Sequence, residues 1–243
     1  MDLIIHLFRY KDLDDDQYLK RQEEIENCAF ANYNHPYIKL MHVFVSPIDL
    51  EYFKELLPKA DFIVSETIPT YTSFLEYASS ALKRDAVVCI AKNDIEFGEL
   101  KPKLLDALKR DEFYSLTSYG ENIKSEGSNI PRYCYFNYDG KHDCFIFRNP
   151  IRINPKNVNY VQDRTNVENR LHLELKKNKY KILNPCTQLP VYHHREFILP
   201  QVKYDPICSQ REIKISEVKP TILSFTMVNR TIGGRLKITS MAY

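Results

Sequence analysis

The feature that most constrains the fold of this chain is an alternation of two patterns over residues 1–118. Apolar runs of strand length lie at residues 3–8, 37–45, 61–65, 86–91 and 113–118. Segments with helical periodicity lie between them, at residues 17–32, 50–57, 70–83 and 99–109. Consecutive parallel strands need a crossover connection, which is usually a helix. The alternation therefore predicts an α/β fold with a mixed, mostly parallel sheet flanked by helices.

The second half of the chain has a different pattern. Residues 133–138 and 144–147 flank an Asp139-Gly140 turn and predict a hairpin. Residues 166–177 have helical periodicity, residues 179–183 are a further strand, and the polar segment 191–195 follows as a tail to the core. Beyond residue 204, apolar residues recur at every second position, which is typical of strands. We predict a domain of residues 1–203 and a β-rich C-terminal extension of residues 204–243.

Composition narrows the classes of partner and the location. The net charge of +2, without long blocks of one sign, disfavours nucleic acid as a partner. We expect no transmembrane segment and no signal peptide, since the apolar runs are short and the start has no basic lead. The six cysteines form no CxxC pair and several lie in apolar runs, so we expect reduced core thiols and a cytoplasmic location.

The stretch Asp85–Phe97 carries the main functional signal. Its apolar run, residues 86–91, reads as a buried strand, and two carboxylates, Asp94 and Glu96, follow it. Ligands of open α/β sheets bind at the carboxyl ends of the strands. Carboxylates there can hold a hard divalent cation, which can in turn bind a diphosphate. We expect a metal–nucleotide site; the alternatives are a helix-capping role for Asp94 and a solvated loop position for Glu96.

Short pieces spread over about residues 1–200 carry a family resemblance. In order, they are Thr70–Phe74, Ile90–Phe97, Ser115–Tyr119, Asp143–Phe147, Glu168–Leu171, Asn184-Pro185 and His193-His194. Together they resemble GT-A-type glycosyltransferases, in particular small bacterial and large-DNA-virus members. The resemblance implies a Rossmann-like GT-A fold, a nucleoside-diphosphate sugar donor (most often UDP), Mn²⁺ or Mg²⁺, and transfer to an acceptor hydroxyl on a glycan or glycoconjugate.

Two positions depart from the family pattern. The family often has a small residue where Lys92 stands, and its metal motif is commonly Asp-x-Asp rather than Asp94-Ile95-Glu96. Glutamate can ligate a metal as aspartate does, but its longer side chain changes the ligand geometry. If the strand continues that far, Asp94 and Glu96 face the same side and can converge.

Further metal-ligand and catalytic candidates come from the later pieces. His193 or His194 is expected to add a metal ligand, and neighbouring side chains on an extended chain point opposite ways. If the reaction inverts configuration, we expect Glu168 to be the general base and Asp143 to bind a sugar hydroxyl. The alternatives are structural histidines, a helix-terminal charge at Glu168 and a turn position at Asp143.

The nucleotide is expected over the tips of the early strands. Arg9 could reach a phosphate and Tyr71 could contact the base, whereas the alternatives are a surface ion pair and a core aromatic. The other expected contacts lie at strand ends or beside the acidic pair: Phe8, Tyr10, Ser65, Glu66, Lys92 and Asn93.

Three other functional classes are alternatives to a glycosyltransferase. A GT-A-like module without activity, which binds a glycan or a protein, would share the same fold. A nucleotidyltransferase would normally have a Gly-rich basic loop after the first strand, but residues 7–16 contain no glycine and are acidic. A dinucleotide-binding dehydrogenase is disfavoured because the sequence contains no G-x-G-x-x-G motif.

Overall fold

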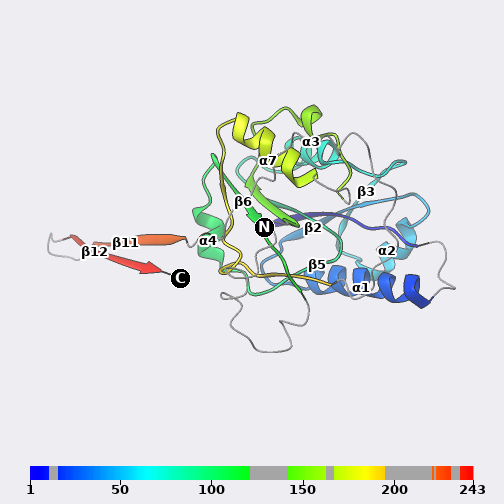
Figure 1. Cartoon of the computed structure of the whole chain (residues 1–243). Coiled ribbons are helices and arrows are strands. Elements are labelled where there is room, and N and C mark those ends of the chain that lie inside the picture. Colours follow the sequence, from blue (N-terminus) through cyan, green and yellow to red (C-terminus); the bar gives the residue numbers. More distant parts are fainter. Residues whose placement is uncertain are drawn as a thin grey trace.

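The computed structural model describes residues 1–10, 16–120, 142–162 and 167–194, Thr221, Leu223, and the backbone of residues 224–230 and 236–242. Within these residues, the main sheet has seven strands in the order β3-β2-β1-β4-β8-β6-β9 (Figure 1). The first strand, β1, lies inside this sheet, whereas the last strand, β12, lies outside it, beyond α4.

The first half of the chain forms the parallel part of the sheet, as predicted. The strands are β1 (Asp2–His6), β2 (Leu40–Val45), β3 (Asp61–Val64) and β4 (Val87–Ala91). β1 pairs in parallel with β2 and β4, and β2 pairs in parallel with β3. The connecting helices are α1 (Asp16–Tyr33), α2 (Leu50–Leu56) and α3 (Tyr71–Ala81). The carboxyl ends of these strands therefore meet along one edge of the sheet.

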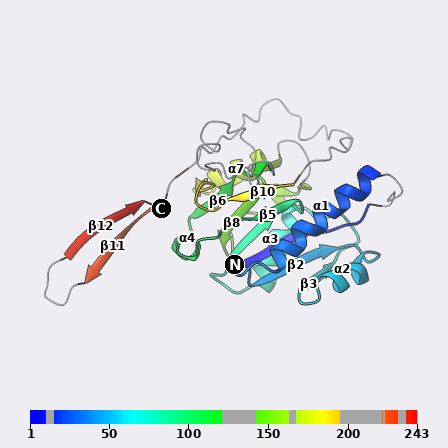
Figure 2. The ribbon, with the colours of Figure 1, turned by 90° about the horizontal axis from the view of Figure 1, so that it is seen from below.

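Helices cover both faces of the sheet (Figures 1 and 2). One apolar core includes Ile25 of α1, Phe53 of α2 and Leu104 of α4 (Pro102–Ala107). The other core includes Phe74 of α3 and Leu171 of α7 (Val167–Lys177). The helix predicted over residues 99–109 is thus shorter than expected, because it begins at a proline that suits the first turn of a helix.

One antiparallel strand interrupts the parallel order. β8 (Cys144–Arg148) runs antiparallel between β4 and β6 (Glu112–Leu116), and β9 (Lys181–Leu183) pairs in parallel with β6. A 3-10 helix, η1 (Pro155–Val158), packs against α3. The predicted hairpin partner of β8, residues 133–138, lies outside the described residues. Because β8 is reversed, its amino end lies beside the carboxyl ends of β4 and β6.

A small second sheet has the order β5-β10-β7. Its strands are β5 (Ile95–Phe97), β10 (Val191–His193) and β7 (Tyr119–Gly120), and β10 is antiparallel to β5. Residues 191–193, expected to be part of a polar tail, are therefore a strand. Gly98 follows β5 where the chains are close: a Cβ there would lie 2.8 Å from Tyr192 Cε2 and 3.0 Å from Pro190 Cγ.

The C-terminal residues contain two strands, as the alternation beyond residue 204 predicted. β11 (Ser224–Arg230) and β12 (Leu236–Ala242) form an antiparallel pair that lies beyond α4 in Figures 1 and 2. Residues 204–220 lie outside the described residues, so the boundary at residue 203 stays a prediction.

The cysteines correct one expectation. Cys28, Cys89 and Cys144 are free and buried, as expected, but Cys186 is disulfide-bonded. The prediction of reduced thiols is wrong for Cys186, because an apolar sequence context does not distinguish a thiol from a half-cystine. Among the described residues, no helix is long and apolar enough to cross a membrane.

Candidate functional site

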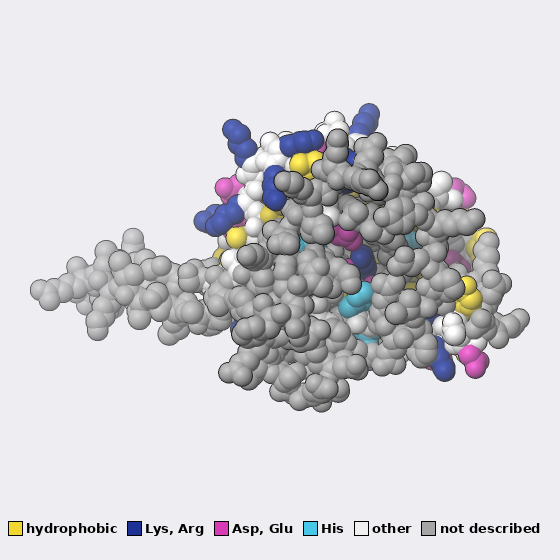
Figure 3. Space-filling view, viewed as in Figure 1, with side chains coloured by type: hydrophobic (Ala, Val, Ile, Leu, Met, Phe, Trp, Pro, Cys, Tyr) yellow, Lys and Arg dark blue, Asp and Glu magenta, His cyan; other side chains and the backbone are white. Residues whose placement is uncertain are grey.

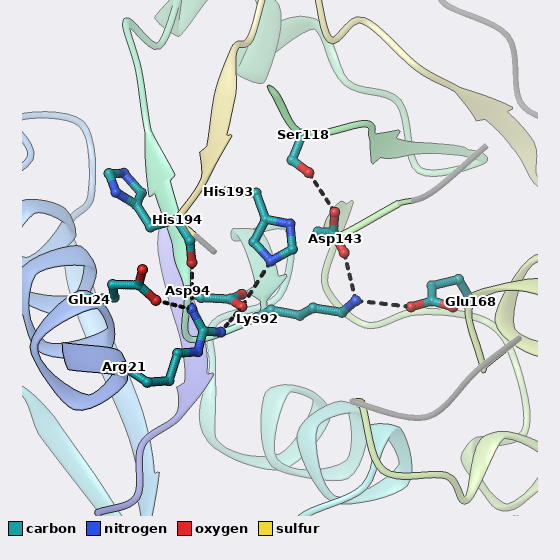
Figure 4. Close-up of polar contacts among 9 residues, drawn as sticks. All are labelled: Arg21, Glu24, Lys92, Asp94, Ser118, Asp143, Glu168, His193 and His194. Carbon is teal, nitrogen blue, oxygen red and sulfur yellow. Dashed lines mark hydrogen bonds and ion pairs between the residues drawn. The ribbon is translucent and has the colours of Figure 1, made fainter. Parts of the chain in front are cut away.

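Charged side chains from distant segments meet at the carboxyl end of β4 (Figure 4). Lys92 and Asp94 follow β4 directly, while Asp143 precedes the reversed strand β8 and is joined to Lys92 through the backbone, with Lys92 N donating to Asp143 O at 3.1 Å. α1, α7 and β10 supply the other members. Figure 3 shows His, Lys or Arg, and Asp or Glu side chains gathered near the middle of the corresponding face.

Asp94 is the most enclosed carboxylate that the sequence analysis assigned to a metal. It is 6% exposed, and its Oδ2 atom accepts hydrogen bonds from Arg21 and from His193 Nε2, the latter at 2.9 Å. Within the described part of the chain, its buried Oδ1 atom has no hydrogen-bond partner. Burial alone would raise the pKa of Asp94, but the hydrogen bond from His193 and the charges of His193, Arg21 and Lys92 hold that pKa well below its usual range. Asp94 is therefore an anion with one oxygen still open.

Arg21 of α1 is a member of this site that the sequence analysis missed. Its Nη1 atom donates to Glu24 Oε2 at 2.6 Å and to the carbonyl of His194 at 2.5 Å, and its Nη2 atom donates to Asp94 Oδ2. The charges of Asp94 and Glu24 outweigh the opposing effect of burial and raise the pKa of Arg21 above its usual value. The sequence contains a sign of this role: Arg21 lies four positions before Ile25, which places a charged residue on the buried face of the helix.

The two predicted ligand histidines contact different carboxylates. His193 lies on Asp94, whereas His194 Nε2 lies 2.8 Å from Glu96 Oε2. Among the described residues, no three His, Cys, Asp or Glu side chains converge as a ready-made metal cluster. The condition for the expected convergence of Asp94 and Glu96 is not met, because Asp94 lies in a turn between β4 and β5 rather than on a continuing strand.

Lys92 is the centre of a second group. Its Nζ atom donates to Asp143 Oδ1 at 2.6 Å and lies 3.3 Å from Glu168 Oε1. Ser118 Oγ donates to the other oxygen of Asp143 at 2.6 Å. Lys92 was expected to contact the nucleotide, but in this structure its ammonium group contacts two carboxylates of the protein. The predicted catalytic pair, Asp143 and Glu168, is thus joined by the lysine that departs from the family pattern.

The two carboxylates of this group have opposite pKa shifts. Burial tends to raise the pKa of Asp143, but the charges of Lys92 and His193, with the hydrogen bonds from Lys92 and Ser118, lower it. For Glu168, in the first turn of α7, burial outweighs the charge of Lys92 and raises the pKa. Two carboxyl groups with diverging pKa values are typical of sites in which one stays ionised and the other exchanges a proton.

The aromatic expected at the base is not available to a ligand. Tyr71 is fully buried in the core of the α3 face and packs edge-to-face against Phe145. Its helical spacing with Phe74 and Leu75 places it on the buried face of α3, so the core alternative holds. Asn93, in contrast, contributes to a small pocket at the ends of β1 and β4, whose other lining residues are His6, Pro69, Val161 and Gln162.

The remaining nucleotide candidates lie along the loops that follow β1 and β3. The guanidinium group of the exposed Arg9 lies 4.2 Å from the centre of the Tyr52 ring, over the face of this aromatic side chain. Phe8 and Tyr10 form an edge-to-face pair 5.2 Å apart. After β3, Ser65 Oγ donates to the carbonyl of Thr67, and Glu66 is exposed.

The residues around Asp94 fit a small divalent cation. Asp94 and His193 lie in contact, with 2.9 Å between Oδ2 and Nε2, and a carboxylate and an imidazole are both groups that ligate divalent metals. The open Oδ1 atom of Asp94 offers a further oxygen. Arg21 and Lys92 contact the carboxylates around the site, which are Glu24, Asp94, Asp143 and Glu168.

The sequence matches no protein-family model and no curated protein. Solved structures are similar in fold. One, from Desulfovibrio desulfuricans G20, is provisionally assigned as a nucleotide-diphospho-sugar transferase; the TM-score is 0.51 at 13% identity, over 79% of this chain and 80% of that chain. The fold is GT-A-like. A second GT-A-like structure, GalNAc-T7 with UDP, GalNAc and Mn²⁺, has a TM-score of 0.50 at 9% identity, over 85% of this chain and 46% of that chain.

Proposed function

We propose that this GT-A-like protein is a metal-dependent glycosyltransferase that transfers a sugar from a nucleoside-diphosphate donor, with UDP as the expected carrier, to an acceptor hydroxyl on a glycan or glycoconjugate. The observation that carries the proposal is Asp94, an enclosed anion with an open oxygen next to His193, at the carboxyl end of β4. The similar GalNAc-T7 structure contains UDP and Mn²⁺, which supports this class of donor and cofactor.

Asp94 and His193 are the residues that would hold the cation. When bound, Mn²⁺ or Mg²⁺ neutralises charge on a leaving diphosphate. The Nε2 atom of His193, which lies 2.9 Å from Asp94 Oδ2, is the imidazole nitrogen that would face the cation. The His194 imidazole lies on the Glu96 carboxylate, so we assign these two side chains a supporting position beside the cation rather than a place among its ligands.

Glu168 is the group that we assign to the acceptor. It is partly exposed, its pKa is raised, and it can accept the proton that an attacking hydroxyl loses. Asp143 is less suited to that step because both of its oxygens already accept hydrogen bonds, from Lys92 and Ser118. Its role in our proposal is to keep Lys92 in place between the donor end of the site and Glu168.

A thermal-shift experiment tests the proposal at the level of binding. UDP with Mn²⁺ should raise the melting temperature more than either compound alone, because a ligand of the native state stabilises it. The shift should be lost in Asp94→Asn and after addition of EDTA. Asp61→Asn is a matched control: Asp61 also accepts bonds from a histidine (His42, 3.0 Å) and a second donor (Tyr77, 2.6 Å), but it begins β3 at the other edge of the sheet.

The result also separates the enzyme from a non-catalytic module. Metal-dependent UDP binding together with turnover of a UDP-sugar, as hydrolysis or transfer, supports the glycosyltransferase. If no nucleoside diphosphate shifts the melting temperature with either Mn²⁺ or Mg²⁺, the proposed donor and cofactor are both wrong. The GT-A-like module that binds a glycan or protein without activity would then be the better assignment.

A further inference from the structure

We propose that Arg21 is a positioning residue for the cation site: it fixes Asp94 and the end of β10, so that Asp94 and His193 present their ligand atoms together. This inference rests on the proposed function. Arg21 does not contact the cation in this proposal. It acts through the carboxylate and the backbone that it binds.

The geometry of the guanidinium is the first support. Its three acceptors come from three segments: Glu24 from α1, Asp94 from the turn before β5, and the His194 carbonyl from the end of β10 (Figure 4). The backbone closes the same link, since His194 N donates to the Asp94 carbonyl at 3.0 Å. The turn that carries Asp94 and the strand end that carries His193 are therefore tied together from both sides.

The chemistry of arginine is the second support. Binding three acceptors in fixed directions requires a planar group with several rigid donors, whereas a lysine ammonium is a point charge on a flexible stem. Arg21 is 8% exposed and Asp94 6% exposed, so their bonds face little competition from water. An outer-shell partner of this kind orients a ligand carboxylate, and loss of such partners typically weakens metal affinity about 10–100-fold.

The charge of Arg21 would by itself repel a cation, but the carboxylate of Glu24 compensates that charge. Glu24 lies 2.6 Å from the Arg21 guanidinium, one turn along α1, and its side chain is also largely buried. The Arg21–Glu24 pair is neutral as a unit. It therefore adds directional hydrogen bonds to the site without adding net positive charge next to the cation.

The test is the affinity for Mn²⁺ in the presence of UDP, measured by titration calorimetry or by the EPR signal of free Mn²⁺. We expect Arg21→Met to weaken Mn²⁺ binding about 10–100-fold, and Arg21→Lys to recover only part of the loss. Glu24→Gln should also weaken it, because the charge of Arg21 is then uncompensated. Neither readout depends on turnover.

Arg148→Met is the matched control. Arg148 is another arginine that donates to carbonyls, those of Leu108, Asp85 and Asp106, but it ends β8 at the far end of the strand from Asp143. Its loss should lower the melting temperature and leave the Mn²⁺ affinity unchanged. A merely structural role for Arg21 predicts the same result for Arg21→Met as for Arg148→Met.

The outcomes distinguish this inference from the proposed function. If the unmodified protein binds Mn²⁺ with UDP, but Arg21→Met and Arg21→Lys bind it equally well or more tightly, the positioning role is wrong and the proposed function stands. If the unmodified protein binds no Mn²⁺ with UDP, the proposed function itself fails. Should Arg21→Met not fold, unchanged affinity in both Arg21→Lys and Glu24→Gln overturns the inference.

Discussion

Arg21 and Lys92 each contact two carboxylates, and the two charged groups that result differ in their surroundings. The Arg21 group contains Glu24 and Asp94, and the Lys92 group contains Asp143 and Glu168. Arg21 is bonded to Asp94, Glu24 and a backbone carbonyl, all within enclosed surroundings. Lys92 is bonded to the buried Asp143 but shares a longer contact of 3.3 Å with Glu168, whose side chain is 18% exposed. The first group fixes positions, while the second leaves one carboxylate at the border with solvent.

The contrast in protonation follows from the charged groups around each carboxylate. Asp94 and Asp143 each receive two hydrogen bonds from the protein, and in both the lowered pKa keeps the anion despite burial. Glu168 has Lys92 alone among the cations that lower its pKa, and burial prevails. Similar side chains in one site thus obtain different protonation behaviour from the charges around them, because Glu168 has one cationic neighbour and is also repelled by Asp143.

Removal of the Asp94 charge should have the largest effect and break the first group. We expect Asp94→Asn to lower sugar transfer about 1,000-fold, since cation stabilisation of the leaving group is worth several kcal/mol. It should also lower the free energy of unfolding by about 3 kcal/mol, because Arg21 loses a buried partner. Initial rates and urea denaturation measure the two effects. Equal activity in Asp94→Asn and Asp61→Asn would contradict the assignment.

Glu168→Gln should break the second group without disturbing the first. We expect kcat to fall about 100- to 10,000-fold, the usual contribution of a general base, with unchanged binding of UDP and Mn²⁺. Glu174→Gln is the control on the same helix, where Glu174 is buried and accepts a hydrogen bond from Asn157 at 2.9 Å. Steady-state kinetics with calorimetry separates the two steps. A parallel loss of UDP binding would place Glu168 at the donor instead.

Lys92→Met tests the second group through the pH dependence of activity. The positive charge of Lys92 lowers the pKa of Glu168, so its removal raises that pKa further. The base form of Glu168 then disappears at a higher pH, and the acid limb of the kcat/KM profile should move upward. At neutral pH we expect activity about 10-fold lower, the equivalent of 1.4 kcal/mol. If the acid limb lies at the same pH in both proteins, Lys92 does not lower the pKa of the catalytic group, and the prediction is wrong.

Ser118→Ala should have the smallest effect and tests Asp143 alone. Loss of a hydrogen bond to a charged group should lower the free energy of unfolding by about 1.5 kcal/mol near neutral pH. The pKa of Asp143 is lowered in the folded state, so its contribution is present above 3.8, the ordinary aspartate value, and is lost as pH falls through the folded value. The deficit of the variant should therefore shrink in acid, which urea titrations at several pH values would detect.

Much of the fold was predictable because local patterns determine it. The alternation over residues 1–118 gave the parallel strands and their helices, and the acidic end of β4 marked the site. Contacts between remote segments were not predictable in the same way. Lys92 meets Asp143 across 51 positions only because β8 is inserted in reverse, and no local pattern predicts the position of a strand in a sheet.

The errors have particular causes. β10 was not predicted as a strand because it is three residues long and pairs with β5, which is distant in the sequence. Arg21 was overlooked although a charged residue on the buried stripe of α1 needs a partner inside the protein. For Tyr71, the same helical spacing fits a core aromatic and a ligand contact, and burial decides for the core.

Gly98 shows that the ligand arrangement also depends on empty space. A methyl group there would overlap the Tyr192 ring, next to His193 on β10, and Gly98 N is bonded to the Pro190 carbonyl at 2.9 Å. An added carbon at Gly98 would require the Tyr192 ring or the Pro190 segment to shift, while every proposed ligand stays in the sequence. The packing beside His193 therefore depends on a residue that has no functional group of its own.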